Sequence, residues 1–210
     1  MDTERGTCGR SRTTATIISN IFHPLMMPTY AASVILYGNT GFNFISNSAK
    51  LYMTTFIFLS TVLLPITVMP ILKYLNLIGS YNLDTRKDRI IPLLIVAICY
   101  MLCMFFLSPE IGFIFARKVF LSAAVLLVLT VSVTAFWKIS IHLAGLGGLS
   151  AIFLNITLAN YGDLTRYLTA TILIAGIVGS CRLYLGAHNL SQILTGFVAG
   201  FITMFLMTLL

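Results

Sequence analysis

Long apolar stretches, separated only by short polar connections, leave this chain few ways to fold. They cover residues 17–37, 51–75, 90–107, 119–137, 142–160, 167–181 and 189–210. All but the sixth have the full length of a membrane-crossing helix, and the alternating ten-residue segments of a membrane β-barrel do not occur. We therefore expect one all-α domain over residues 1–210, a polytopic bundle of about six to seven transmembrane helices. A polar N-terminal tail occupies residues 1–15.

Composition leads to the same class of protein. Hydrophobic residues make up 58% of the 210 residues, charged residues make up 9%, and the mean hydropathy is +0.96. A soluble domain of this size cannot bury so much apolar surface, so we predict an integral membrane protein. The first apolar stretch is a poor signal peptide because it is long and contains His23, Pro24 and Pro28. A kinked first span fits it better.

The charged residues gather at the ends of the apolar stretches. If successive spans alternate in direction, four charged regions meet at one face of the membrane. These regions are the tail before residue 15 and the segments 84–89, 137–142 and 182–188. Three spans also begin at this face, and helix N-termini favour phosphate through free N–H groups and partial positive charge. With a net charge of +7, we expect anionic lipids or an anionic substrate as partners, and no nucleic acid.

The segment from Ser180 to His188 is the strongest indication of function. Arg182 and His188 lie beside an expected helix start, and Gln192 follows four residues later, on the face of His188. An arginine can bind phosphate through its fork of donors, and a neutral histidine can attack phosphorus. The Gln192 carbonyl could accept Nδ1–H of His188 and leave Nε2 unprotonated. The alternative is an interfacial arginine beside a histidine that caps a helix.

Two further groups of polar residues lie on the same predicted face. His142 follows Ser140 and Lys138 at the start of a span, where a general acid could protonate a leaving alkoxide. In isolation His142 is better explained as a polar residue at a helix start, and Lys138 as an interfacial anchor.

A basic cluster precedes Pro92, and its cations are Arg86, Lys87 and Arg89. It either neutralises a phosphate or forms an ordinary positive-inside loop. His23 has no partner in sequence, so we expect a structural or water-lined position for it. Gly196 and Gly200 form a Gly-x-x-x-Gly pattern, which predicts close helix packing.

In order and approximate spacing, these motifs resemble the type-2 phosphatidic acid phosphatase superfamily. Its pattern is Lys-x6-Arg-Pro, then Pro-Ser-Gly-His, then Ser-Arg-x5-His-x3-Asp. The resemblance covers residues 86–192, about half of the chain, and its third motif is the most specific. The phrase Arg-Leu-Tyr-Leu-Gly-Ala-His after Cys181 resembles a small multi-span branch of that superfamily.

The resemblance implies a role for each matching position. Arg182 would bind phosphate, His188 would form a phosphohistidine, and His142 would protonate the leaving group. Ser140 would help to hold phosphate, with cations supplied by Arg86, Lys87 or Arg89. The implied activity is removal of phosphate from a lipid phosphate or diphosphate, without a metal or other cofactor.

The chain departs from the superfamily pattern at each motif. Arg89 is separated from Pro92 by two isoleucines, and the second motif has lost its Pro and Gly. Cys181 replaces the Ser of the third motif, and Gln192 replaces the Asp that would orient and charge-stabilise His188. A substitute carboxylate such as Asp84 or Asp88, slow catalysis, and loss of activity are all compatible with this change.

Three functions follow from these observations. The first is the lipid phosphate phosphohydrolase, and the second is a non-catalytic relative that binds or moves a lipid phosphate. The third, a polyprenyl transferase, is suggested by Asn82-x-Asp84-x3-Asp88. It needs a second acidic cluster to hold Mg²⁺-diphosphate, and Asp163 alone, on the opposite face, does not provide one.

Two observations point to opposite sides of the membrane for the site. We expect the bacterial inner membrane, where the excess of Lys and Arg on the N-terminal face favours a cytoplasmic N-terminus. The resemblance to bacterial lipid phosphatases favours a periplasmic site instead.

Overall fold

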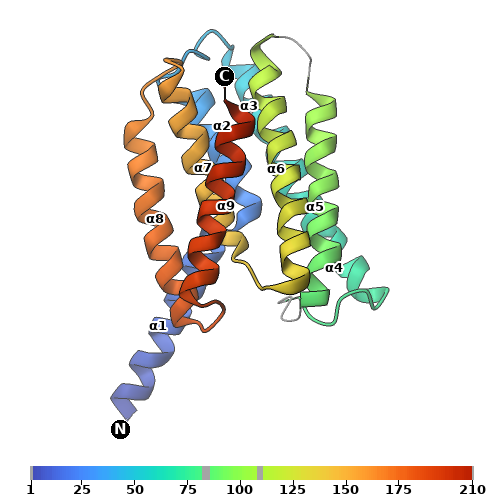
Figure 1. Cartoon of the computed structure of the whole chain (residues 1–210), viewed down its shortest axis with the longest axis vertical. Coiled ribbons are helices and arrows are strands. Elements are labelled where there is room, and N and C mark those ends of the chain that lie inside the picture. The colour runs from blue at the N-terminus through green and yellow to red at the C-terminus, as the bar shows by residue number, and fades with distance from the viewer. Residues whose placement is uncertain (1, 82–85, 108–110, 210) are drawn as a thin grey trace.

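The protein is a bundle of helices that run up and down past one another (Figure 1). The computed structural model describes the backbone of residues 2–81, 86–107 and 111–209, and side chains within 11–81, 88–107 and 114–209. Over these ranges the chain forms helices and no strand. Six helices are long and apolar enough to cross a membrane: Asn47–Tyr74, Asp88–Phe106, Ile114–Phe136, Ile141–Leu158, Thr165–Tyr184 and Leu190–Thr208. The prediction of an all-α membrane bundle is confirmed.

The chain runs back and forth along the length of the bundle (Figure 1). In order they are α1 (Asp2–Ile21), η1 (Pro24–Met26), α2 (Met27–Tyr37), α3 (Asn47–Phe58), η2 (Leu59–Leu63), α4 (Leu64–Tyr74), α5 (Arg86–Phe106), α6 (Ile111–Phe136), α7 (Ile141–Leu158), α8 (Thr165–Tyr184) and α9 (Leu190–Thr208). The start of α1 and the segments 75–81, 137–140 and 185–189 lie at the lower end of Figure 1. The start of α5 lies there too, so the described parts of the four charged regions share one end of the bundle, as predicted, while residues 84 and 85 lie outside the described residues.

The first apolar stretch is broken at His23 and is not one continuous helix. The helix α1 ends at Ile21, and His23 is extended, with φ −66° and ψ 141°. The ring of Pro24 disfavours helical backbone at the preceding residue, and proline has no N–H for a helical hydrogen bond. The stretch 17–37 is therefore divided among α1, the short 3₁₀ turn η1 and α2. This division explains why the expected seventh span is not among the six long apolar helices.

The second apolar stretch contains a local widening of the helix. Between α3 and α4 the chain forms a π-helical turn, η2, and Pro65 lies within the first turn of α4. Proline cannot donate to the preceding turn, so a wider turn just before it is a common accommodation. Beyond this turn, side chains of α4 form part of a cavity on the charged side of the bundle.

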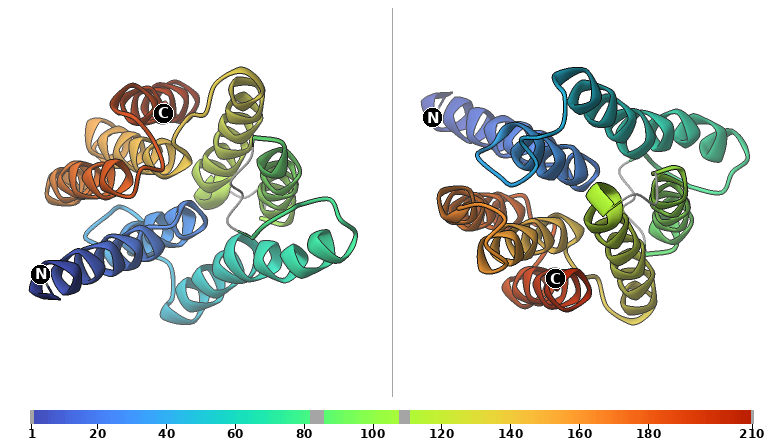
Figure 2. Two further views of the ribbon diagram at one scale, coloured as in Figure 1. Left: turned by 90° about the horizontal axis from the view of Figure 1, so that it is seen from below. Right: turned by 90° about the horizontal axis from the view of Figure 1, so that it is seen from above.

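The helix α7 is the centre of the bundle. In its apolar window 67% of the residues are buried, against 22% in both α8 and α9. Figure 2 shows α7 packed side by side with α9, with α8 on its other side. A Cβ on Gly196 would lie 2.5 Å from the carbonyl oxygen of Ser140, and one on Gly200 would overlap the carbonyl of Ala144. The predicted Gly-x-x-x-Gly packing is confirmed, because only glycine permits this approach of α9 to α7.

Candidate functional site

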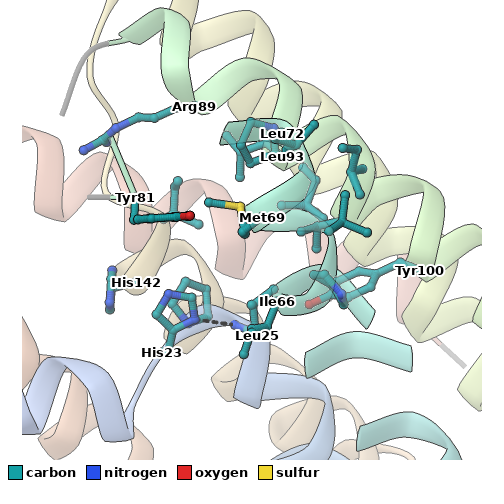
Figure 3. A pocket seen from close by; sticks show the side chains of 18 of the residues that line it. His23, Leu25, Ile66, Met69, Leu72, Tyr81, Arg89, Leu93, Tyr100 and His142 are labelled. Atoms are coloured by element: carbon teal, nitrogen blue, oxygen red, sulfur yellow. Dashed lines mark hydrogen bonds between the residues drawn. The ribbon is translucent and has the colours of Figure 1, made fainter. Parts of the chain in front are cut away.

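A cavity of about 290 Å³ opens near the charged end of the bundle. Its ionisable and polar lining residues are three histidines, two arginines and two tyrosines: His23, His142, His188, Arg89, Arg182, Tyr81 and Tyr100. Figure 3 shows Arg89, Tyr81, His142 and His23 following one another along one side of this space. Among the described lining residues there is no Asp or Glu. The polar part of the cavity therefore suits an anion.

The rest of the cavity wall is apolar. Part of this wall comes from α4 and α5, which face the space beside Tyr100 in Figure 3. The apolar lining residues of these two helices are Pro65, Ile66, Val68, Met69, Leu72, Pro92, Leu93, Ile95 and Val96. A cavity with cationic and imidazole groups at one side and a long apolar wall at the other matches an amphiphile with an anionic headgroup.

The turn between α8 and α9 explains the spacing of Arg182 and His188. Gly186 has φ +66°, its N–H donates to the carbonyl of Leu183, and the N–H of Ala187 donates to the carbonyl of Arg182. This Schellman arrangement ends α8 at a left-handed residue, which glycine adopts without strain. The chain then reverses, so that Arg182 from the last turn of α8 and His188 both line the cavity.

The next turn begins α9 and fixes the ring of His188. Asn189 is the N-cap: its side-chain oxygen accepts the N–H of Gln192, and Gln192 Oε1 accepts the N–H of Asn189. Gln192 Oε1 also lies 3.1 Å from Nδ1 of His188. The backbone donor identifies the amide atom as the oxygen, and an oxygen can only accept. Nδ1 of His188 therefore carries its proton, and Nε2 carries a lone pair, as the sequence predicts.

His188 is held in its neutral form. The residue is only 7% exposed, and its surroundings lower the pKa of its imidazole to about 4 from the ordinary 6.5. Burial is the largest cause of this lowered pKa, followed by the positive charge of Arg182; Arg89 and Lys138 act in the same direction, and the hydrogen bond to Gln192 opposes them. At neutral pH the ring is a nucleophile or a hydrogen-bond acceptor at Nε2.

Arg182 lies where its charge acts on all three histidines. It interacts electrostatically with His23, His142 and His188. Its Nε is buried, and no hydrogen-bond partner for that atom is found within the described residues. A buried guanidinium N–H without an acceptor is costly, and an oxyanion in the cavity would satisfy it.

His142 reaches the cavity from α7. It is the second residue of that helix, and its hydrogen-bond partner is the backbone of Ser19 in α1. Its ring meets the ring of His23 edge to face, with centroids 5.4 Å apart and an interplanar angle of 80°. The three long-separated segments around residues 23, 142 and 188 thus converge on one space.

Arg89 brings a second guanidinium to the cavity from the first turns of α5. It is 8% exposed, lines the cavity and acts electrostatically on His188. Of the predicted basic cluster, Arg86 and Lys87 begin α5, and their side chains lie outside the described ones.

Two predicted phosphate ligands, Ser140 and Lys138, do not line the cavity. Ser140 is fully buried, its N–H donates to the carbonyl of Gln192, and its backbone lies against Gly196 of α9. Its hydroxyl has no partner within the described residues. These backbone contacts join the start of α7 to α9, and the role of Ser140 in holding phosphate stays a prediction. Lys138 reaches the site through its charge on His188.

Asp88, one of the carboxylates considered as a substitute for the missing Asp, is bound elsewhere. Asp88 accepts a hydrogen bond from the backbone N–H of Gly79, with a distance of 2.9 Å, and does not line the cavity. Asp84 lies outside the described residues. Gln192 is therefore the described side chain that orients His188.

His23 and the apolar wall are the site features that the sequence interpretation missed. We expected a structural or water-lined place for His23, yet its ring lines the cavity beside His142. The signal was present in His23-Pro24, because a proline after a histidine marks a break where a side chain can turn into the bundle.

No metal centre is indicated within the described part of the chain, where no group of three or more His, Cys, Asp or Glu side chains could hold an ion. No protein-family model, no curated protein and no solved structure matches this chain.

Proposed function

We propose that this membrane protein is a phosphohydrolase that removes phosphate from a lipid phosphate or diphosphate through a phosphohistidine on His188, without a metal ion. One observation carries the proposal. Gln192 fixes the tautomer of His188, so that an unprotonated Nε2 belongs to a cavity that also holds Arg182 and His142. This set of groups meets the needs of phosphoryl transfer, which depends on positioning and on charge stabilisation.

The first half-reaction uses three side chains. Arg182, with Arg89 nearby, binds the non-bridging oxygens of the phosphate. Nε2 of His188 attacks phosphorus, and the bond from phosphorus to the leaving oxygen breaks, with its electron pair going to that oxygen. His142 gives the leaving oxygen a proton, and the negative charge of the bound phosphate favours the protonated ring that this step needs.

The second half-reaction restores the protein. Neutral His142 takes a proton from a water molecule as the water attacks phosphorus of the phosphohistidine. The bond between phosphorus and Nε2 breaks, its electron pair returns to His188, and inorganic phosphate leaves. Throughout, Gln192 keeps the proton on Nδ1, which directs the chemistry to the other nitrogen.

The apolar wall supports a lipid substrate. A soluble phosphate ester would leave the described wall of α4 and α5 without a partner, whereas a lipid tail would cover it. The same cavity holds the phosphate-binding groups, so headgroup and tail could be bound together. We propose a membrane lipid phosphate or polyprenyl diphosphate as substrate and the bacterial inner membrane as the location.

Phosphate release by the detergent-purified protein in EDTA tests this function. The substrates are short-chain phosphatidate and farnesyl diphosphate, and the variants are His188→Ala and His142→Ala. We expect release by the wild type, loss of at least a thousandfold in His188→Ala and a smaller loss in His142→Ala, roughly a hundredfold. Acid-labile radioactive label on the wild type, trapped by denaturation and absent from His188→Ala, would identify the phosphohistidine.

A lipid phosphate binder is the second candidate function, and Gln192 favours it. A carboxylate in its place would stabilise a cationic His188, and Gln192 offers no charge. This candidate predicts that short-chain phosphatidate binds to the wild type and is not hydrolysed. Loss of release in His188→Ala would contradict it, and absence of release from a correctly folded wild type would contradict the phosphohydrolase.

A further inference from the structure

We propose that His23 is a substrate-binding residue that donates Nε2–H to a non-bridging phosphate oxygen beside His142. This inference rests on the proposed function for its substrate class, a phosphate ester. It adds to the site a residue from the break between α1 and α2, far in sequence from the other groups.

The backbone determines which nitrogen of His23 is the donor. The N–H of Leu25 points to Nδ1 of His23, with a distance of 3.3 Å, in the N-cap position of η1 (Figure 3). A nitrogen that accepts from a backbone N–H carries no proton, so the neutral ring carries its proton on Nε2. The nearby positive charge of Arg182 favours this neutral ring.

The surroundings determine where that donor can act. His23 lines the cavity together with His142, Arg182, His188 and Arg89. Its ring lies edge to face against His142, and no hydrogen bond between the two rings or from Nε2 is found within the described residues. The described lining of this cavity carries cationic groups and no carboxylate. An anionic ligand is therefore the expected acceptor for the N–H of His23.

The position also explains why a histidine stands before Pro24. Pro24 keeps residue 23 extended, which ends α1 and turns the side chain toward His142. His23 then has two functions, one at each nitrogen: Nδ1 caps η1, and Nε2 donates to substrate. A helix-capping role alone would use only Nδ1.

Two substitutions separate these functions. His23→Asn places an oxygen near the position of Nδ1 and removes the donor at Nε2. His23→Gln places an amide nitrogen near the position of Nε2 and removes the acceptor for Leu25. If His23 binds substrate, His23→Asn is the more damaging change for affinity, and if it only caps η1, His23→Gln is the more damaging change for stability.

The binding experiment uses the full chain in the His188→Ala background, so that no turnover occurs. Dissociation constants are measured for inorganic phosphate and for short-chain phosphatidate, with thermal unfolding of each variant alongside. We expect His23→Asn to weaken both ligands by the same factor, between roughly tenfold and a hundredfold, because the lost hydrogen bond goes to phosphate. We expect His23→Gln to bind both ligands at least fivefold more tightly than His23→Asn.

Each outcome bears directly on His23. Equal affinities of His23→Asn and the parent protein, or tighter binding by His23→Asn than by His23→Gln, would overturn the proposal. Weakening of short-chain phosphatidate alone would also overturn it, because that result would assign His23 to the lipid tail. The binding measurement is independent of catalysis, so absence of phosphate release from the wild type would refute the proposed function and leave this test intact.

Discussion

At the scale of single residues, Gln192 determines what His188 can do. Its Oε1 accepts from the backbone of Asn189 and from Nδ1 of His188, which selects the tautomer without adding charge. A carboxylate in that place would also stabilise the positive charge that develops on the ring as Nε2 bonds to phosphorus. His188, the proposed nucleophile, is therefore oriented but has little stabilisation of its cationic form.

Gln192→Glu should increase the rate of phosphate release. Glutamate has nearly the same shape, can keep both hydrogen bonds and is common at this position of a capping box. Its negative charge should raise the pKa of His188 and increase kcat on the order of tenfold. Steady-state rates in EDTA check this, with Gln192→Leu as the control that removes the acceptor of both hydrogen bonds and loses activity. A Gln192→Glu variant slower than the wild type would contradict the electrostatic argument.

The lowered pKa of His188 predicts how stability changes with pH. The ring titrates near 4 in the folded protein and near 6.5 when it is exposed by unfolding. Between these values the unfolded chain binds more protons, so the contribution of neutral His188 is complete above 6.5 and is lost as the pH falls toward 4. Unfolding at a series of pH values should show this loss in the wild type and a weaker one in His188→Gln. Identical pH dependence of the two proteins would contradict it.

At the scale of elements, the site depends on how closely α7 and α9 approach. His142 lies at the start of α7 and His188 just before α9, and the glycines of α9 lie directly against the backbone of α7. Displacing one helix would move the expected acid away from the expected nucleophile. The packing of these helices is thus part of the geometry of the site.

Gly200→Ala should separate the two helices. Its Cβ would overlap the Ala144 carbonyl, which cannot move without breaking α7. We expect a loss of about 1–3 kcal/mol in unfolding free energy and a lower kcat, measured by thermal unfolding and phosphate release. Gly176→Ala is the matched control, because a Cβ at Gly176 on α8 has no described atom within 4 Å. Equal stability of the two variants would contradict the packing argument.

Some features of the helices and of the site could be predicted from the sequence, and others could not. Apolar length was sufficient for the spans of α5 to α9, because a helix is the simplest way to satisfy backbone polar groups in a bilayer. Helical spacing predicted the pairing of His188 with Gln192, and the structure contains the pair, but His188 lies before the N-cap Asn189, outside α9. The spacing did not reveal that Ser140 is fully buried against Gly196, since that depends on the packing of α7 against α9. Nor did it reveal the apolar wall, which only the packing of α4 and α5 creates.

At the scale of the whole molecule, the alternating helices put the N-terminal end and the site cavity on one side and the C-terminus on the other (Figure 1). Because the site lies near one end of the bundle, all of its residues lie toward the same side of the membrane. The cationic residues near this end favour the cytoplasm by the positive-inside rule, although several of them belong to the site itself. A site on the outer side would instead act on lipid phosphates of the outer leaflet.

Labelling of single cysteines with a membrane-impermeant maleimide answers this question. In a background without the four native cysteines, Leu77→Cys reports on the side of the site and Asn43→Cys on the opposite side, because both residues are exposed in connections between helices. We expect Asn43→Cys to react in intact cells and Leu77→Cys only after the membrane is opened. The reverse pattern would place the site on the outer side and the N-terminus outside the cytoplasm. Reaction of both in intact cells would contradict the alternating path of the helices, because Leu77 and Asn43 lie at opposite ends of α3 and α4.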